Sequence, residues 1–251
     1  MDMHDDAQAP RPGERLDDLQ RGGLRILQRP DAFRFGTDAV LLAAFAAPLG
    51  RARVVDLGTG TGILPLLMAA RSPAATFAAI EIQPDMADMA ARSVALNGLS
   101  QRIAVHPGDL RDAPALLGHG RTDLVVCNPP YGKRGAALQN PDVRHALARH
   151  EGETTLADIT ASAASLLRNG GRLAMVFPAP RLLELLDVWR AAHIEPKTVR
   201  LVQQRADSVP KLALILGTKR ARPGLHWQPA LVLCDAQGAY TPEVRAMYAQ
   251  G

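Results

Sequence analysis

The sequence contains very little cysteine, no long apolar run and no basic-then-apolar leader. Cys127 and Cys234 are the only cysteines in 251 residues, and without metal-site spacing they exclude a disulfide framework and favour a reducing compartment. The longest apolar run, residues 39–50, is too short to cross a bilayer. The first ten residues, MDMHDDAQAP, are acidic and polar, unlike a secretory signal. We therefore expect a cytoplasmic protein with no membrane partner and no metal, of undefined oligomeric state.

The composition is that of a soluble globular protein, with 47% apolar and 22% charged residues. The length suits one large α/β domain with small extensions. The net charge of +4 is compatible with a nucleic-acid partner, and between residues 165 and 222 eleven Lys or Arg outnumber four Asp or Glu. A solvated basic face explains this charge distribution about equally well.

The N-terminal part is divided by its turn signals. Residues 1–15 are polar and contain Pro10, Pro12 and Gly13, which predicts a disordered tail. Residues 24–28 and 32–35 are predicted as two short strands, and Thr37 or Asp38 is predicted to cap an apolar helix. The expected organisation is a tail over 1–15, an extension of hairpin and helix over 16–50, and the main domain over 51–251.

Beyond residue 51, short apolar runs alternate with helical patterns, which predicts βαβ units and a mostly parallel seven-stranded sheet. About eight residues separate the last two strands, too few for a crossover helix, so they should form an antiparallel hairpin. The predicted strands are 53–57, 76–80, 102–106, 123–127, 172–177, 197–203 and 212–218, and the predicted helices are 62–71, 84–98, 155–168 and 181–192.

A glycine-rich turn follows the first of these strands in the string VVDLGTGTG, residues 54–62. Glycine permits positive φ and close approach of a ligand to the N-terminus of a helix. The spacing is G-x-G-x-G, with Ile63 where a dinucleotide fingerprint needs its third glycine, and no phosphate-binding lysine follows. A turn required only for packing is the alternative interpretation of this string.

Three acids strengthen the case for a ligand. Asp56, Glu81 and Asp109 are predicted at the carboxyl ends of three successive parallel strands, the edge at which open α/β sheets bind ligands. Glu81 could accept both hydroxyls of a ribose, and Asp109 could accept from an adenine amino group. The pattern therefore predicts a ligand that contains adenosine and need not contain phosphate.

The fourth strand runs directly into Asn128-Pro129-Pro130-Tyr131. The two prolines offer no N–H and hold the preceding residues extended, so the backbone presents carbonyl acceptors beside the amide oxygen of Asn128. Such a site selects an –NH₂ group, and accepting its two hydrogens localises the nitrogen lone pair for nucleophilic attack. Tyr131 would stack on the target. A plain proline-rich turn is the alternative, and Cys127 as a nucleophile is disfavoured because it lies in the apolar strand.

These features together resemble the class I S-adenosylmethionine-dependent methyltransferases, and the string D-L-G-T-G-T-G is a specific match. The resemblance implies a Rossmann-like fold with an antiparallel final strand and S-adenosylmethionine as cofactor. It assigns the methionine end to Asp56 and the glycine turn, the ribose to Glu81 and the adenine to Asp109. The full implied cofactor set is Phe35, Thr37, Asp56, Gly58, Thr59, Gly60, Gly62, Glu81, Ile82, Asp109, Leu110 and Asn128.

The flanking segments resemble the bacterial family that methylates the exocyclic amine of adenine 37 in tRNA-Val. The likeness runs through residues 23–28, 33–42, 81–83, 128–131, 148–151 and 229–248. Residues 206–210 depart from the family pattern. The resemblance implies tRNA as partner, with Phe35 and Thr37 closing over the methionine end of the cofactor.

Residues 132–152 are predicted to gate the substrate, because their basic side chains could grip phosphates beside a splayed anticodon-loop base. His150 as a catalytic base is a less favoured role than an RNA contact. The predicted substrate contacts are Lys133, Arg134, Arg149, His150, Arg205 and Lys211.

Two other functions stay open. A glutamine-amide methyltransferase acting on a protein such as a release factor shares the cofactor and the Asn-Pro-Pro-Tyr corner, but those enzymes carry a larger N-terminal domain. A non-catalytic RNA-binding module on the same fold would not need the glycine turn, both acids and the corner together.

Overall fold

The structure is a computed structural model of the 251-residue chain. It describes residues 9–19, 22–29, 36–47, 50–129 and 154–249. The expected strand over 32–35 and the segment 132–152 that is predicted to gate the substrate lie outside these residues.

A central sheet carries the fold, and its main strands follow the order β8-β9-β7-β6-β3-β4-β5. The strands β7, β6, β3, β4 and β5 run parallel to one another, whereas β9 is antiparallel to both of its neighbours, β7 and β8. The bounds are β3 Arg53–Leu57, β4 Thr76–Glu81, β5 Ile103–Pro107, β6 Thr122–Cys127, β7 Leu167–Pro178, β8 Ile194–Gln203 and β9 Leu212–Lys219. Two short strands, β10 (His226–Trp227) and β11 (Leu231–Val232), extend the sheet beside β8.

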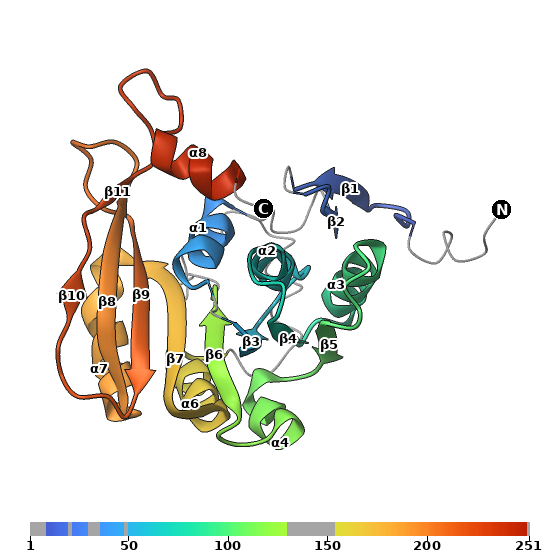
Figure 1. Ribbon diagram of the computed structural model, residues 1–251, viewed down its shortest axis with the longest axis horizontal. Coiled ribbons are helices and arrows are strands. Elements are labelled where there is room, and N and C mark those ends of the chain that lie inside the picture. Colours follow the sequence, from blue (N-terminus) through green and yellow to red (C-terminus); the bar gives the residue numbers. More distant parts are fainter. Residues whose placement is uncertain (1–8, 20–21, 30–35, 48–49, 130–153, 250–251) are drawn as a thin grey trace.

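Helices cover both faces of the sheet (Figure 1). One apolar cluster joins α1, α2 and α3 to side chains such as Val54 and Val126, and the other joins α4, α6 and α7 to Val55 and Val125. This alternation of neighbouring residues between two cores is the pattern of strands buried on both faces. The bounds are α1 Thr37–Phe45, α2 Ile63–Arg71, α3 Pro84–Leu96, α4 Ala113–Leu117, α6 Leu156–Leu166, α7 Leu182–Ala191 and α8 Pro242–Ala249, with 3₁₀ turns η2 Leu110–Asp112 and η3 Ala179–Arg181.

The predicted fold class is confirmed. All seven predicted strands are present, the four predicted helices correspond to α2, α3, α6 and α7, and the last two long strands form the expected antiparallel hairpin. The sheet order reverses at β3, which pairs with β4 on one side and β6 on the other. Ligands of open α/β sheets bind at the carboxyl ends of the strands at such a switch point.

The N-terminal extension differs from the prediction at two places. The strand predicted over 24–28 is β2 (Arg25–Gln28), and it pairs antiparallel with β1 (Arg15–Asp18), a segment that was not predicted as a strand. The predicted N-cap of α1 was wrong, since the N-cap is Gly36 rather than Thr37 or Asp38, and no side chain caps this helix. The contacts made here, of β2 with α3 and of Thr37 with Tyr240, join segments far apart in the chain, so no local pattern predicts them.

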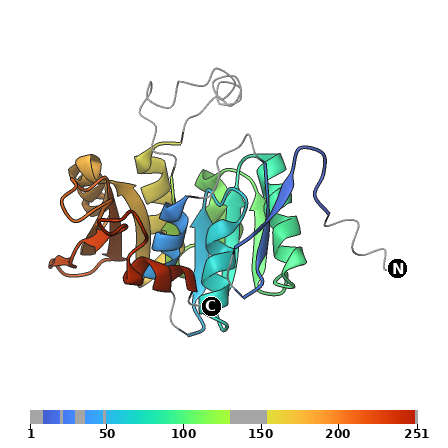
Figure 2. The ribbon, with the colours of Figure 1, turned by 90° about the horizontal axis from the view of Figure 1, so that it is seen from above.

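The segment before β1 is attached to α3. Arg92 of α3 donates to both carboxylate oxygens of Glu14, at 2.6 and 2.9 Å, and to Asp88 at 2.8 Å. Arg11 pairs with the same Asp88, and β2 packs against α3, so the hairpin and its lead-in lie along this helix (Figure 2). The expected division into tail, extension and main domain stays a prediction. Within the described segments, no helix has the length and apolar character needed to span a membrane.

Replacing Arg92 with alanine should destabilise the protein. The Arg92 and Glu14 side chains are only 8% and 10% exposed, so removing one partner leaves a buried charge and should lower the free energy of unfolding by about 2–3 kcal/mol. Arg92 also lowers the pKa of Glu14, so the pair's contribution should be present above the ordinary glutamate pKa and fade as the pH falls through the lowered value.

Urea unfolding at pH 7 and pH 3 measures both effects. The matched control is Glu184→Gln, which removes the more exposed partner of Arg181 and should change stability by less than about 1 kcal/mol. An equal loss of unfolding free energy in Arg92→Ala and Glu184→Gln would contradict the structural role given to Arg92.

Candidate active site

The glycine turn that follows β3 is held against the end of β4. The amides of Gly58 and Thr59 both donate to the carbonyl of Ile80, each at 2.9 Å, and the amide of Gly60 donates to the carboxylate of Glu81 at 2.8 Å. The turn then enters α2 through Gly62, the N-cap, which lies in the left-handed region at φ +85°. The backbone of the turn is therefore fixed before any ligand arrives.

The glycines of this turn serve two different purposes. A Cβ on Gly62 would approach the Cβ of Ala90 in α3 to 3.2 Å, so this glycine permits close packing of the turn on α3. A Cβ on Gly58 or Gly60, both at positive φ, would meet no atom within 4 Å. The space beside these two glycines is thus open, as expected where a ligand approaches the backbone.

Asp56 is the one buried acid of the described sheet edge whose two carboxylate oxygens have no hydrogen-bond partner among the described residues. The residue is 1% exposed, and burial raises its pKa to about 7. The charge of Glu81 raises this pKa further, while the nearby hydroxyl of Thr59 opposes the shift without making a hydrogen bond of standard geometry. A buried acceptor pair without partners is costly, so the site favours a ligand that brings donors or positive charge.

Glu81, at the end of β4, lies between the glycine turn and the next loop. Its two oxygens accept from the amides of Gly60 and Gln83, at 2.8 and 2.9 Å. Each carboxylate oxygen has a second lone pair, so the residue can still accept ribose hydroxyls. Ile82 follows it and is 43% exposed, an apolar side chain at the rim of the same edge.

Asp109 follows β5 and already has a cationic partner. It caps η2, and Arg111 donates to it through both its backbone amide, at 2.8 Å, and its guanidinium group. These interactions hold the pKa of Asp109 below its ordinary value. An adenine amino group would have to share this carboxylate with Arg111. Leu110 is largely buried, and its carbonyl accepts from Ser162 of α6, which fixes the turn.

Asn128 and Pro129 continue β6 at the switch point. The last registered pair between β3 and β6 joins Asp56 to Val126, and Asn128 follows the last residue of β6, at the sheet edge where the glycine turn follows β3. Pro129 is buried, and Asn128 is partly exposed. Cys127 is 1% exposed, and burial beside Asp56 raises the pKa of its thiol, which agrees with a packed rather than a nucleophilic cysteine.

One contact at the start of α1 has no local signal in the sequence. The hydroxyl of Thr37 lies 3.3 Å from that of Tyr240 and accepts from that of Tyr248 at 3.4 Å, and the two tyrosine rings stack with centroids 5.5 Å apart. The C-terminal segment thus holds the first turn of α1. The likeness of residues 229–248 to a family pattern was the signal that could have pointed to it.

The structure brings together most of the predicted site at the carboxyl ends of β3, β4, β5 and β6: Asp56, the glycine turn, Glu81, Ile82, Asp109, Leu110 and Asn128. Arg205 and Lys211 lie on the same edge at the β8–β9 turn. Among the residues described, no group of three or more His, Cys, Asp or Glu side chains is arranged to hold a metal. Other predicted residues lie outside the described part: Phe35, Pro130, Tyr131, Lys133, Arg134, Arg149 and His150.

This site fits S-adenosylmethionine. The open side of the glycine turn can receive its methionine portion, and the carboxylates of Asp56 and Glu81 match a ligand that carries a sulfonium and an ammonium charge. A phosphate-bearing dinucleotide would bring negative charge to these two acids. The sheet order, the antiparallel β9 and the acidic glycine turn define a class I S-adenosylmethionine-dependent methyltransferase.

Comparison with known proteins supports the assignment to this class. The family described as "Methyltransferase small domain" matches residues 31–185. A tRNA1(Val) (adenine(37)-N6)-methyltransferase of Porphyromonas gingivalis is 36% identical, with 84% of this chain and 86% of that protein covered. A protein of the same name from Tolumonas auensis is 31% identical over 86% of this chain and 88% of its own length. The crystal structure of a predicted O-methyltransferase from Agrobacterium tumefaciens shares the fold, with a TM-score of 0.70 at 24% identity, covering 84% of this chain and 95% of that one.

The chain belongs to the methyltransferase small domain family. It also belongs to the same family as the two relatives from Porphyromonas gingivalis and Tolumonas auensis.

Replacing Asp56 with asparagine should stabilise the ligand-free protein at alkaline pH. The folded pKa of about 7 lies above the ordinary value of 3.8, so ionising Asp56 opposes folding, and this penalty grows as the pH rises from about 4 to 7. The asparagine variant should gain up to about 4 kcal/mol in unfolding free energy at pH 8 and little at pH 4. Urea unfolding across this pH range measures the gain.

The Asp56→Asn variant should also bind S-adenosylmethionine far more weakly, because it lacks the negative charge that favours a cationic ligand. Calorimetry measures this loss of affinity. Thr122→Val serves as a control at a buried, uncharged residue at the start of β6, away from this sheet edge. A pH-independent difference between wild type and Asp56→Asn would count against the raised pKa.

Proposed function

We propose that the enzyme transfers a methyl group from S-adenosylmethionine to the exocyclic amine of adenine 37 in tRNA-Val. The observation that carries this proposal is the position of Asn128 and Pro129 directly after β6, the strand beside β3, at the sheet edge that also carries the glycine turn. A site for an –NH₂ group then lies beside a site for a cationic methyl donor. The names of the bacterial relatives support adenine 37 as the particular amine.

S-adenosylmethionine supplies, when bound, an electrophilic methyl group on a positively charged sulfur. Asn128 accepts one hydrogen of the adenine amine through its amide oxygen, and a backbone carbonyl of the corner accepts the other. Proline at 129 removes a competing N–H donor from this surface. Because both hydrogens are held, the nitrogen lone pair turns out of the ring plane and toward the methyl carbon.

The Asn-Pro-Pro-Tyr corner also stabilises the methylated nitrogen until that nitrogen loses a proton. As the bond from the nitrogen to the methyl carbon forms, the carbon–sulfur bond would break and the cofactor would leave as a neutral thioether. The nitrogen would then be positively charged, and a hydrogen bond to an oxygen acceptor would stabilise that charge until a proton leaves to solvent. Preorganised acceptors of this kind carry much of the rate without a strong general base. Pro130 completes this corner and Tyr131 stacks on the adenine in the proposed mechanism.

The remaining cofactor contacts follow the same logic. Asp56 binds the ammonium group, Glu81 the ribose hydroxyls, and Ile82 and Leu110 border the adenine. Asp109 accepts from the adenine amine while remaining paired with Arg111, since each of its oxygens has two lone pairs. Phe35 and Thr37 close over the methionine end, with Thr37 steadied by Tyr240 and Tyr248.

An anticodon-loop adenine is single-stranded and can be splayed into such a corner without opening a duplex. Basic residues after the corner would hold its neighbouring phosphates in the proposed complex: Lys133, Arg134, Arg149 and His150. A tRNA substrate is consistent with a cytoplasmic enzyme. Methylation of a release-factor glutamine is not favoured, because relatives that match more than four fifths of this chain are named for tRNA.

Asn128→Ala should reduce methyl transfer by at least the order of 10²–10³-fold that loss of one preorganised group produces, because one of the two acceptors is gone. Binding of S-adenosylmethionine should be largely retained. Single-turnover transfer to tRNA and calorimetric titration of the cofactor separate the two quantities. Asn169→Ala, at an exposed asparagine near the start of β7, is the matched control and should keep full transfer activity. Turnover at the wild-type rate in Asn128→Ala would exclude the acceptor mechanism.

The substrate can be identified directly. Purified enzyme with S-adenosylmethionine and tRNA-Val transcript should yield N6-methyladenosine at position 37, detected by mass spectrometry of nucleosides and of ribonuclease fragments. A transcript with guanosine at position 37 should yield none. Methyl transfer to a release factor and not to tRNA would replace the proposed function with the protein-amide alternative.

A further inference from the structure

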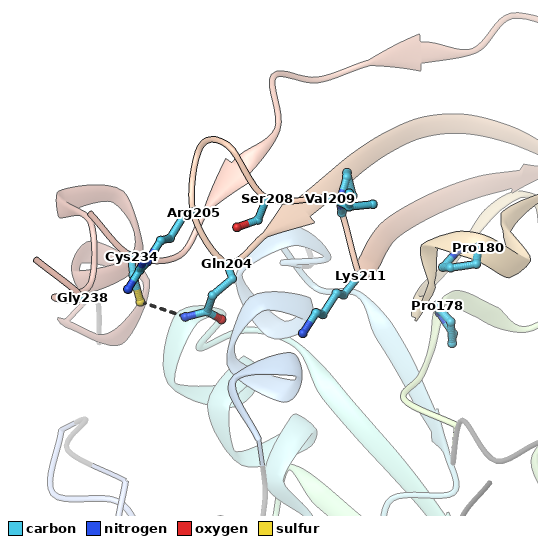
Figure 3. A pocket seen from close by; sticks show the side chains of 10 residues that line it. Pro178, Pro180, Gln204, Arg205, Ser208, Val209, Lys211, Cys234 and Gly238 are labelled. Atoms are coloured by element: carbon cyan, nitrogen blue, oxygen red, sulfur yellow. Dashed lines mark hydrogen bonds between the residues drawn. The ribbon is translucent and has the colours of Figure 1, made fainter. Parts of the chain in front are cut away.

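A cavity of about 870 Å³ lies where β7, β8 and β9 reach the carboxyl edge of the sheet. Figure 3 shows the β8–β9 turn on one side of it and Pro178 and Pro180 on the other, with Lys211 between them. The full lining is Pro178, Pro180, Gln204, Arg205, Ser208, Val209, Pro210, Lys211, Cys234 and Gly238. A volume in this range suits a single small ligand or one residue of a larger one.

The walls of the cavity are held by hydrogen bonds. Ser208 donates its amide to the carbonyl of Arg205 at 3.0 Å, and its own carbonyl accepts from the side chain of Gln203 at 2.7 Å. Lys211 joins the turn to both neighbours, since its amide donates to Val202 and its carbonyl accepts from Ala179. A surface turn fixed in this way can position side chains for a partner at little cost in conformational entropy.

The lining combines positive charge with exposed apolar surface. Arg205 and Lys211 have no side-chain hydrogen bond or ion pair within the described portion of the chain, and none of the ten lining residues is acidic. Asp207 belongs to the same turn but does not line the cavity. Val209 is 81% exposed, beside Pro210 and opposite Pro178. The cationic side chains of such a lining can bind phosphates, and its apolar side chains can pack against the face of an unstacked base.

The cavity shares its sheet edge with the proposed methyl-transfer corner. Cys127 at the end of β6 is registered with Met175 of β7, and Pro178 further along β7 is registered with Leu212 of β9. Two strand spacings of about 4.8 Å and three residues along β7 put the cavity roughly 10–15 Å from Asn128. A splayed single strand whose adenine occupies the corner reaches this distance within a few nucleotides.

We propose that this cavity is a subsite for a nucleotide that flanks the target adenine. Arg205 and Lys211 bind its phosphates, and Val209 with the prolines packs against its base. This inference rests on the proposed tRNA methylation and adds a second point of recognition, which selects the loop around the adenine rather than the adenine itself.

The salt dependence of RNA binding tests the phosphate contacts. The logarithm of the tRNA association constant falls with the logarithm of salt concentration by about 0.7 for each single-strand phosphate contact. Arg205→Gln with Lys211→Gln should therefore reduce the slope by about 1.4, with a rise in KM for tRNA. The control Arg220→Gln removes a cation just beyond the opposite end of β9 and should leave slope and KM unchanged. Lys211→Arg should retain the wild-type slope.

Val209→Ser tests the base contact separately. It should leave the salt slope unchanged and weaken the preference of the enzyme for the natural loop over transcripts that carry an abasic residue beside adenine 37. Far-ultraviolet circular dichroism checks that each variant is folded.

The outcomes distinguish the two proposals. Parallel salt slopes for wild type and the double variant, in an enzyme that methylates tRNA-Val, would overturn the subsite and leave the proposed function standing. A wild-type enzyme that methylates a protein and not tRNA would overturn both. A reduced slope in the double variant, with an unchanged slope in Arg220→Gln, supports the subsite.

Discussion

The site depends on one constraint, the attachment of the glycine turn to the end of β4. Two amides of the turn share the carbonyl of Ile80, and a third binds the carboxylate of Glu81. These hydrogen bonds fix the turn so that its open side faces the switch point between β3 and β6. They also keep Asp56 below the turn. Without them the positive-φ glycines would leave the turn free to move, and the buried acid would have no fixed surface at which to meet a ligand.

Burial of Asp56 links stability to ligand binding. A carboxyl with a pKa of about 7 and no hydrogen-bond partner among the described residues opposes folding when it is ionised, and a cationic ligand relieves that penalty on binding. Glu81 adds a second negative charge next to it, so the site is selective for positive charge. The same arrangement disfavours the phosphates of a dinucleotide, in agreement with the missing third glycine at Ile63.

Much of the core could be predicted because its signals are local. Apolar strands such as 53–57 and 123–127 lie between helical patterns, and their length and alternation predict a parallel sheet with both faces covered. The N-terminal hairpin could not be predicted in the same way, because Arg15–Asp18 is as polar as the tail around it and pairs only where α3 supports β2. The partner of Asp109 was missed for a related reason: the short 3₁₀ turn that brings Arg111 back onto it has no strong sequence signal.

By itself, the sequence determined the class of fold, the acidic glycine turn and the position of Asn128 after a buried strand, since each depends on residues close together in the chain. Only the tertiary structure decided that Asp56 has no hydrogen-bond partner among the described residues, that Thr37 is held by two tyrosines about two hundred residues away, and that Arg205 and Lys211 line one cavity with Pro178. Burial, desolvation and cavity shape arise from packing between distant segments, and no local pattern of residues encodes them.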